Sequence, residues 1–216
     1  MTPVAGVAFL DAVPSVDPFA LMNAVGLVAF AVVGSLKAME ADLDVFGVAV
    51  LGVLTALGGG VTRDVLVGRI PVALQSTTDV GVVLFGVALA VSLRRWRSRR
   101  LRDHTVLLLA DAVGLAAFAA TGALVGVDAG LSTFGVVTLA ALTGVGGGSI
   151  SDVLLDRVPA VLREDFYATP AVVGGVAFWV AVRLGVAPGT AVLPCAALVF
   201  ALRLLALRYE WGLPTV

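Results

Sequence analysis

The chain has 216 residues, of which 60% are hydrophobic and 13% are charged, and its mean hydropathy is +1.07. A soluble domain normally has about 25% charged residues, so this composition indicates an integral membrane protein rather than a soluble enzyme. The formal net charge of −1 gives no support to nucleic-acid binding.

Seven segments are long and apolar enough to be transmembrane helices, which need about 20 residues each to cross the hydrocarbon core. In chain order they cover residues 19–37, 45–68, 77–95, 105–127, 132–156, 168–186 and 188–208. The predicted fold class is therefore an all-α membrane protein with seven transmembrane helices. The first residues have no basic segment, so we expect no cleavable signal peptide.

Arginines between the third and fourth predicted helices set the expected orientation. Loops rich in Lys and Arg stay on the cytoplasmic side, and this loop has Arg94, Arg95, Arg97, Arg99, Arg100 and Arg102. Counting helices from it predicts a multi-pass protein of the plasma membrane with its N-terminus outside and its C-terminus in the cytoplasm. Arg63 and Arg69 fall on the outer side against this trend, which suggests that they have a structural or functional partner.

The sequence contains an internal duplication. Residues 23–74 align with 111–162 without a gap, at a constant offset of 88, and 26 of the 52 aligned positions are identical. Each copy belongs to a unit of three helices, an odd number, so the two units are expected to insert in opposite orientations. We predict a first three-helix repeat at 19–104, a second, inverted repeat at 105–187, and a seventh helix at 188–211.

A run of three glycines recurs at the same place in both copies. Each glycine lowers helix propensity by roughly 1 kcal/mol relative to alanine, so we expect the two helices to bend or unwind there. Unwinding frees backbone carbonyls, which together with nearby hydroxyls and carboxylates form an oxygen-rich lining suited to a monovalent cation. The predicted pathway residues are Thr55, Gly58, Gly59, Gly60 and Asp64 in the first copy, and Thr143, Gly146, Gly147, Gly148, Ser149 and Asp152 in the second.

The glycines also have a simpler interpretation. Glycine in membrane helices most often permits close packing of two helices, and a single triplet would favour that role. Two triplets at matching positions, each followed by an aspartate at the same spacing, favour a pathway instead. A nucleotide-binding loop is a third possibility, but it needs a preceding strand in an α/β domain, which this pattern of helices does not offer.

Few other residues could do chemistry. A charge at the bilayer centre costs at least about 2.5 kcal/mol. For Asp111, whose counterpart in the first copy is Asn23, we therefore favour the pathway or a polar contact between helices over a shallow interfacial position. Lys37 ends the first helix and is expected at the membrane interface. The single Cys195 and single His104 leave no pattern for a disulfide, a tightly bound metal or a catalytic site. We therefore predict no enzyme and no cofactor.

At these residues the sequence resembles the prokaryotic branch of the TRIC family (trimeric intracellular cation channels), which is also catalogued as a glycine-transporter domain family. The resemblance spans about residues 20–211 and is carried by Thr55-Ala56-Leu57-Gly58-Gly59-Gly60 with Arg63-Asp64, Asp111-Ala112-Val113-Gly114-Leu115, and Thr143-Gly144-Val145-Gly146-Gly147-Gly148. It implies two inverted three-helix repeats plus a seventh helix, a homotrimer, and one cation pore inside each protomer at the glycine kinks. It also implies a weak preference for potassium over sodium.

Two positions depart from the family pattern. Ser151 stands where many members have arginine, so the Arg63-Asp64 pair occurs only once. The counterpart of Lys37 is Val125, where many relatives have a lysine on the fourth helix. Arg63, Lys37 and Ser151 are therefore the candidates for a structural or gating role.

The predicted function is a potassium-type channel whose partners are membrane lipids, K⁺ and Na⁺. The alternative is a secondary transporter of glycine or another small solute, which inverted repeats and interrupted helices fit equally well. The predominance of oxygen acceptors among the polar groups favours the channel. A scaffold whose polar residues are only structural is a third, weaker hypothesis.

Overall fold

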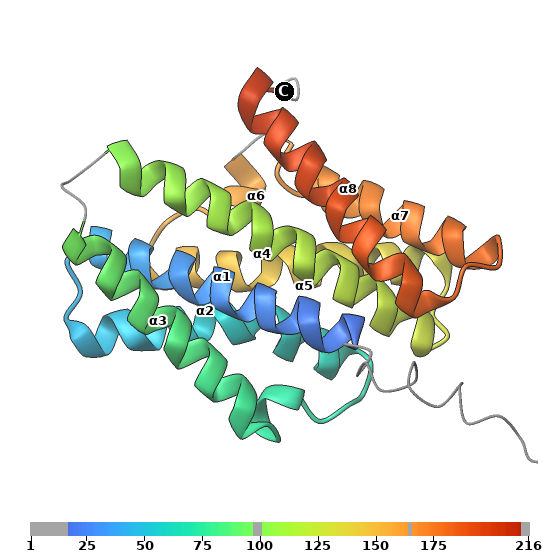
Figure 1. The fold of residues 1–216 in the computed structure, drawn as a ribbon, viewed down its shortest axis with the longest axis horizontal. Coiled ribbons are helices and arrows are strands. Elements are labelled where there is room, and N and C mark those ends of the chain that lie inside the picture. Colours follow the sequence, from blue (N-terminus) through green and yellow to red (C-terminus); the bar gives the residue numbers. More distant parts are fainter. Residues whose placement is uncertain (1–16, 97–100, 164–165, 213–216) are drawn as a thin grey trace, which may run out of the picture.

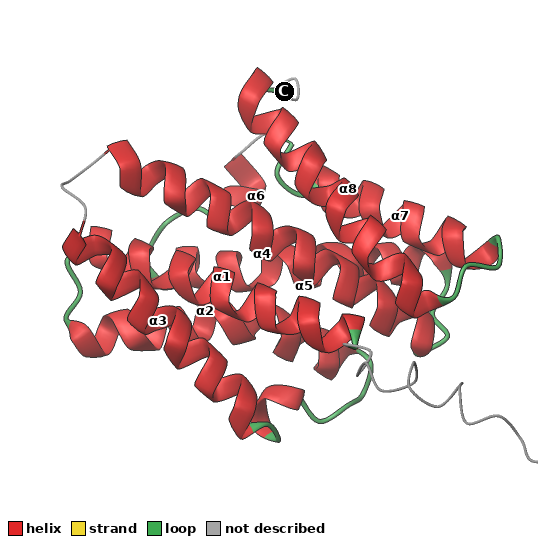
Figure 2. Ribbon diagram, in the orientation of Figure 1, coloured by secondary structure: helices red, strands yellow, loops and turns green. Residues whose placement is uncertain are grey.

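The computed structural model describes residues 17–96, 101–163 and 166–212, and its regular elements there are all helices (Figure 2). They are α1 (Pro18–Glu40), α2 (Val45–Leu66), the 3-10 helix η1 (Val72–Leu74), α3 (Thr77–Trp96), α4 (Leu101–Asp128), α5 (Thr133–Leu154), α6 (Ala160–Arg163), α7 (Thr169–Arg183) and α8 (Pro188–Tyr209). Arg97, Arg99 and Arg100, on which the predicted orientation largely rests, lie outside the described residues.

The predicted class of all-α membrane protein is confirmed. Within the described ranges, six helices are long and apolar enough to cross a bilayer: α1, α2, α4, α5 and α8 over their full or nearly full length, and α3 over Thr77–Arg94. The predicted sixth span corresponds to α7, which is apolar but has only 15 residues. That is shorter than the roughly 20 residues of a full crossing.

Polar residues at corresponding positions of the two sequence copies begin α2 and α5. The Asp44 carboxylate accepts a hydrogen bond from the Gly47 N–H at 2.7 Å, and the Ser132 hydroxyl accepts one from the Gly135 N–H at 3.2 Å. Such N-caps satisfy N–H groups that a helix leaves without partners in its first turn. Loop residues that look unrelated thus start the two triplet helices in the same way.

The helices α1 and α4 form the centre of the bundle (Figure 1). Helix α1 packs against α2, α3 and α4, whereas α4 packs against α1, α5, α7 and α8. In Figure 1, α3 and α8 are inclined to the other long helices and lie on opposite sides of this centre. The largest cluster of buried apolar side chains is shared by α4, α5, α7 and α8.

Neither glycine triplet interrupts its helix. Helix α2 runs continuously through Gly58-Gly59-Gly60, and α5 runs continuously through Gly146-Gly147-Gly148. The expectation of unwound segments with freed carbonyls is therefore wrong for this structure. The physical reason is a close crossing of α2 and α5 at the triplets. The packing between the two helices stabilises them and offsets the low helix propensity of glycine.

Candidate functional site

The middle glycine of each triplet forms the point where α2 and α5 cross. A Cβ atom on Gly59 would overlap the carbonyl oxygen of Thr143, and a Cβ atom on Gly147 would overlap the carbonyl oxygen of Thr55. The two contacts are reciprocal, because each glycine faces the threonine that precedes the other triplet. These two glycines therefore have the packing role that was the simpler interpretation of the sequence.

The threonine hydroxyls are bonded within their own helices. The Thr55 hydroxyl donates to the Leu51 carbonyl and the Thr143 hydroxyl to the Leu139 carbonyl, each at 2.6 Å, and both threonines are fully buried. The Ser149 hydroxyl likewise donates to Val145 at 2.9 Å. These protons stabilise the continuous helices, so the oxygens can act toward a solute only as acceptors.

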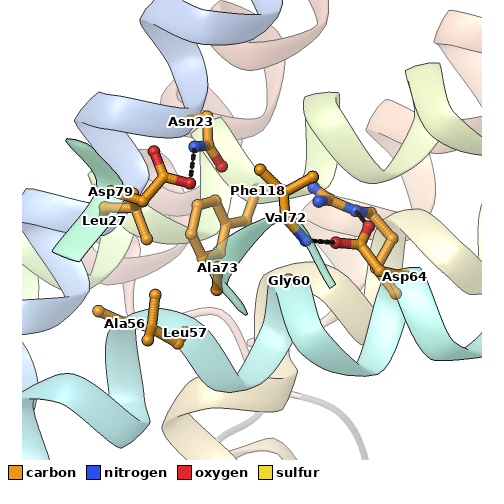
Figure 3. A pocket seen from close by; sticks show the side chains of 11 residues that line it. Asn23, Leu27, Ala56, Leu57, Gly60, Asp64, Val72, Ala73, Asp79 and Phe118 are labelled. Atoms are coloured by element: carbon orange, nitrogen blue, oxygen red, sulfur yellow. Dashed lines mark hydrogen bonds and ion pairs between the residues drawn. The ribbon is translucent and has the colours of Figure 1, made fainter. Parts of the chain in front are cut away.

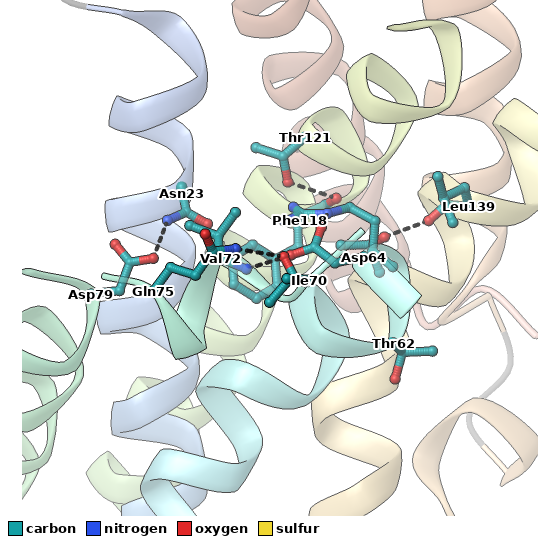
Figure 4. Close-up of polar contacts among 12 residues, drawn as sticks. Asn23, Thr62, Asp64, Ile70, Val72, Gln75, Asp79, Phe118, Thr121 and Leu139 are labelled. Atoms are coloured by element: carbon teal, nitrogen blue, oxygen red, sulfur yellow. Dashed lines mark hydrogen bonds and ion pairs between the residues drawn. The ribbon is translucent and has the colours of Figure 1, made fainter. Parts of the chain in front are cut away.

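Asp64 and Asp152 have matching roles at the ends of α2 and α5. One carboxylate oxygen of Asp64 accepts the Val72 N–H, and one oxygen of Asp152 accepts the Ala160 N–H, each at 3.0 Å. The acceptor and donor are eight residues apart in both copies. Each aspartate thus holds the chain that follows its helix, and both are nearly fully buried. Figure 4 shows the Asp64 contact among its polar neighbours.

The two aspartates obtain their cations from different places. Asp64 pairs with Arg63 of its own helix, with 2.8 Å between Nε and Oδ1, whereas Asp152 pairs with Lys37 of α1 at 2.6 Å. The Ser151 hydroxyl donates instead to the Gly148 carbonyl at 2.8 Å. Lys37 thus supplies, from another helix, the cation that the second copy lacks beside Asp152.

A second pair of matching contacts involves residues that the sequence analysis missed. The Asn23 amide donates to the Asp79 carboxylate at 3.4 Å, and the Tyr167 hydroxyl donates to the Asp111 carboxylate at 2.8 Å. The offset of 88 relates Asn23 to Asp111 and Asp79 to Tyr167. Extending the repeat beyond residue 74 was the signal that could have found Asp79 and Tyr167. Asp111 of α4 thus contacts a residue of the segment that precedes α7, and its place in a pathway stays a prediction.

These contacts form two polar clusters: the first contains Asn23, Arg63, Asp64 and Asp79, and the second contains Lys37, Asp111, Asp152 and Tyr167. A small cavity adjoins the first cluster (Figure 3). Its volume is about 20 Å³, and its wall includes Asn23, Gly60, Arg63, Asp79 and Phe118. The Nη1 group of Arg63 is buried and has no hydrogen-bond partner among the described residues. A cavity of this size holds one water, and polar groups of this kind are what a buried water requires.

The third glycine of each triplet faces a polar cluster and not the crossing. The position of a Cβ atom on Gly60 would be 3.8 Å from Arg63 Nη2, and that of one on Gly148 would be 3.5 Å from the Tyr167 hydroxyl. Arg203 of α8 lies over the Tyr167 ring, 4.6 Å from its centre, and adds a cation at that end. The triplets therefore combine packing at their middle residue with a polar surface at their last residue.

The two polar clusters lie at opposite ends of α1. Asn23 and Lys37 are 14 residues apart on this helix, which corresponds to about 21 Å at 1.5 Å per residue. Asn23 contacts Asp79 at one end, and Lys37 contacts Asp152 at the other. The site thus consists of two polar clusters separated by the crossing of α2 and α5.

Comparison with known proteins gives a consistent set of relatives. A protein-family model described as "Glycine transporter" matches twice, over residues 20–95 and 108–183. The chain is 38% identical over 199 residues to a UPF0126 membrane protein of Vibrio cholerae, covering 90% of this chain and 81% of the relative. It is 37% identical over 196 residues to the UPF0126 inner membrane protein YadS of Escherichia coli, covering 90% of this chain and 94% of the relative.

Solved structures agree with these sequence relatives. A protein solved in a study of conductance through TRIC cation channels has a TM-score of 0.82 at 36% identity, covering 92% of this chain and 97% of that one. A prokaryotic TRIC channel crystallised in 0.5 M KCl has a TM-score of 0.83 at 32% identity, covering 90% and 98%. The TRIC trimeric intracellular cation channel orthologue from Rhodobacter sphaeroides has a TM-score of 0.82 at 29% identity, covering 89% and 98%.

Proposed function

The chain belongs to the TRIC family, and we propose that it is a passive channel for monovalent cations. The family model that it matches is described as a glycine transporter, and the members of the family are membrane proteins and not enzymes. The observation that carries the proposal is the pair of matching polar clusters at opposite ends of one protomer. A conduit for ions needs polar groups from both membrane surfaces toward its middle, because an unpaired charge in hydrocarbon is costly.

The charges of the first cluster favour cations. Arg63 is neutralised by Asp64. Among the residues that the structure describes, the Asp79 carboxylate then has only a long hydrogen bond, from the Asn23 amide. The cluster therefore has one carboxylate more than it has cations, and a cation entering here is attracted. Oxygen ligands of this kind suit monovalent cations such as K⁺ and Na⁺. The small preference for K⁺ that we propose rests on the resemblance to the family.

The proposed pathway follows the last glycines of the two triplets. Gly60 borders the cavity of the first cluster, and Gly148 lies against Tyr167 in the second. A missing side chain at each position leaves room for water beside the polar groups. The pore of each protomer would then run past both triplets, through the space between α1, α2, α4 and α5.

The fold suggests how the protomer sits in the membrane. The repeated sequence and its matching contacts support two inverted three-helix repeats, with α8 as the seventh transmembrane helix and α7 as a short sixth. Phe46 and Phe134, at corresponding positions of α2 and α5, are 77% and 79% exposed, which suits contact with lipids or another protomer. We propose a homotrimer, as the name of the trimeric relative from Rhodobacter sphaeroides implies. From the arginine-rich segment we further propose that it lies in the plasma membrane with its N-terminus outside.

Recordings from purified protein in planar bilayers test this function. The channel predicts unitary K⁺ currents, whereas the alternative, a transporter of glycine or another small solute, predicts saturable glycine uptake without unitary currents. Glycine is the solute to test, because the matching family model is described as a glycine transporter.

Asp79 gives the test a residue of this chain. Asp79→Asn should shift the reversal potential in a KCl gradient toward that of chloride, because the surplus carboxylate is lost. Asp128→Asn, at the exposed end of α4, is the matched control and should leave the reversal potential unchanged. Equal effects of the two substitutions would contradict the role assigned to Asp79.

A further inference from the structure

Two phenylalanines at corresponding positions of the repeat meet in the middle of the protein. Phe30 of α1 and Phe118 of α4 are related by the offset of 88, and both are fully buried. Their ring centres are 5.3 Å apart with an interplanar angle of 65°, an edge-to-face contact. Each sequence copy thus contributes one ring to a single aromatic pair.

The pair lies in line with the polar groups at both ends. On α1, Asn23, Phe30 and Lys37 follow one another at intervals of seven residues. Seven residues are almost two turns, so these side chains lie along one stripe of the helix, about 10 Å apart. Asp111 and Phe118 have the same spacing on α4. A path along this stripe therefore meets a polar group, the aromatic pair, and a second polar group.

Close contacts hold the rings in place. A Cβ atom on Gly26 would overlap the Phe118 ring, and one on Gly114 would lie 2.8 Å from the Phe30 ring, so each ring fills the space left by a glycine of the opposite helix. Phe118 also approaches the position of a Gly59 Cβ atom to 3.5 Å, beside the crossing of α2 and α5. Figure 3 shows the Phe118 ring among the residues that line the cavity of the first cluster.

We propose that the Phe30–Phe118 pair is the barrier to permeation in this protein. The inference rests on the proposed channel function and adds the residues that close it. An apolar constriction excludes water, and an ion without water or polar ligands has a high free energy there. The two polar clusters are therefore disconnected while the rings touch, and conduction requires the rings to separate.

Ordinary core packing is the competing explanation, and Phe178 provides the matched control. This residue is also fully buried, but it belongs to the cluster shared by α4, α5, α7 and α8, whereas Phe30 and Phe118 belong to a separate cluster. Replacing any of the three phenylalanines by alanine removes a similar buried volume. Only the two central residues should change the passage of ions.

The experiment measures K⁺ efflux from proteoliposomes that contain equal amounts of full-length protein. Phe30→Ala and Phe118→Ala should raise efflux about tenfold over the unmodified protein, which corresponds to a barrier lower by about 1.4 kcal/mol. Phe178→Ala should leave efflux unchanged. Phe30→Leu and Phe118→Leu keep an apolar side chain, and they should give smaller increases in variants that disturb folding less.

Each result decides the question. The proposed barrier is overturned if the folded alanine and leucine variants of Phe30 and Phe118 pass K⁺ no faster than the unmodified protein. The proposed channel function would remain. An equal increase in Phe178→Ala also overturns it, because the leak then follows from a loosened core. If neither the unmodified protein nor any variant passes K⁺, the proposed channel function fails, and the barrier fails with it.

Discussion

Alanine substitutions at two adjacent glycines separate helix packing from the ion pathway. A Cβ atom at Gly59 would overlap the backbone oxygen of Thr143, which can yield only if α2 and α5 move apart. At Gly60 the nearest atom is a side-chain nitrogen of Arg63 at 3.8 Å, so a methyl group fits. Both substitutions place the same group one residue apart in the same helix.

The expected energies have opposite signs. Alanine gains up to about 1 kcal/mol over glycine in helix propensity at either position. Overpacking costs about 1–3 kcal/mol, and a clash with backbone belongs at the upper end of this range. Gly59→Ala should therefore destabilise the protein by about 2 kcal/mol after the gain in propensity. Gly60→Ala should stabilise it by up to about 1 kcal/mol.

Thermal unfolding in detergent and K⁺ efflux from proteoliposomes measure the two effects. A protein of this size shifts its melting temperature by roughly 2–4 °C per kcal/mol, so the two variants should differ by several degrees. Gly60→Ala should also reduce efflux, because its methyl group enters a cavity of about 20 Å³. Equal melting temperatures would refute the crossing argument, and normal efflux through a stable Gly60→Ala protein would refute the pathway past Gly60.

The buried ion pairs yield two more predictions. Arg63→Ser should destabilise the protein by about 3–5 kcal/mol, because the buried Asp64 carboxylate loses its cation. Adding Val125→Lys should recover part of this stability, since position 125 corresponds to Lys37 in the repeat, and thermal unfolding of the single and double variants measures the recovery. Lys37→Met should destabilise less when combined with Asp152→Asn than alone, and a double variant less stable than Lys37→Met would contradict the pair.

Local patterns in the sequence predicted the helices well. The apolar runs place the long helices, and the observed bounds differ from the predicted ones by a few residues. Helix continuity at the triplets was not predictable in this way. Propensity describes one segment alone, whereas the compensating contact of Gly59 comes from Thr143, which is distant in the sequence.

The candidate site was predicted in part. Asp64 and Asp152 stood out because their spacing from the glycines is the same in both copies. The partner of Asp152 is Lys37, 115 residues away, and no local pattern relates the two. Asp79 and Tyr167 are different residue types, so identity did not single them out, and only the offset of 88 extended beyond residue 74 relates their positions. Contacts between distant segments are what the sequence leaves open.

The two ion pairs connect different helices, so the two similar sequence copies are held together in different ways. The Arg63–Asp64 pair is contained within α2 and moves with that helix as one body. The Lys37–Asp152 pair joins α1 to α5 and acts as a latch between the two sequence copies. Separating α1 from α5 must therefore break an ion pair, whereas the Arg63–Asp64 pair stays intact when α2 moves as a body. Of the two aspartates, Asp152 thus ties its own sequence copy to the other one, and Asp64 does not.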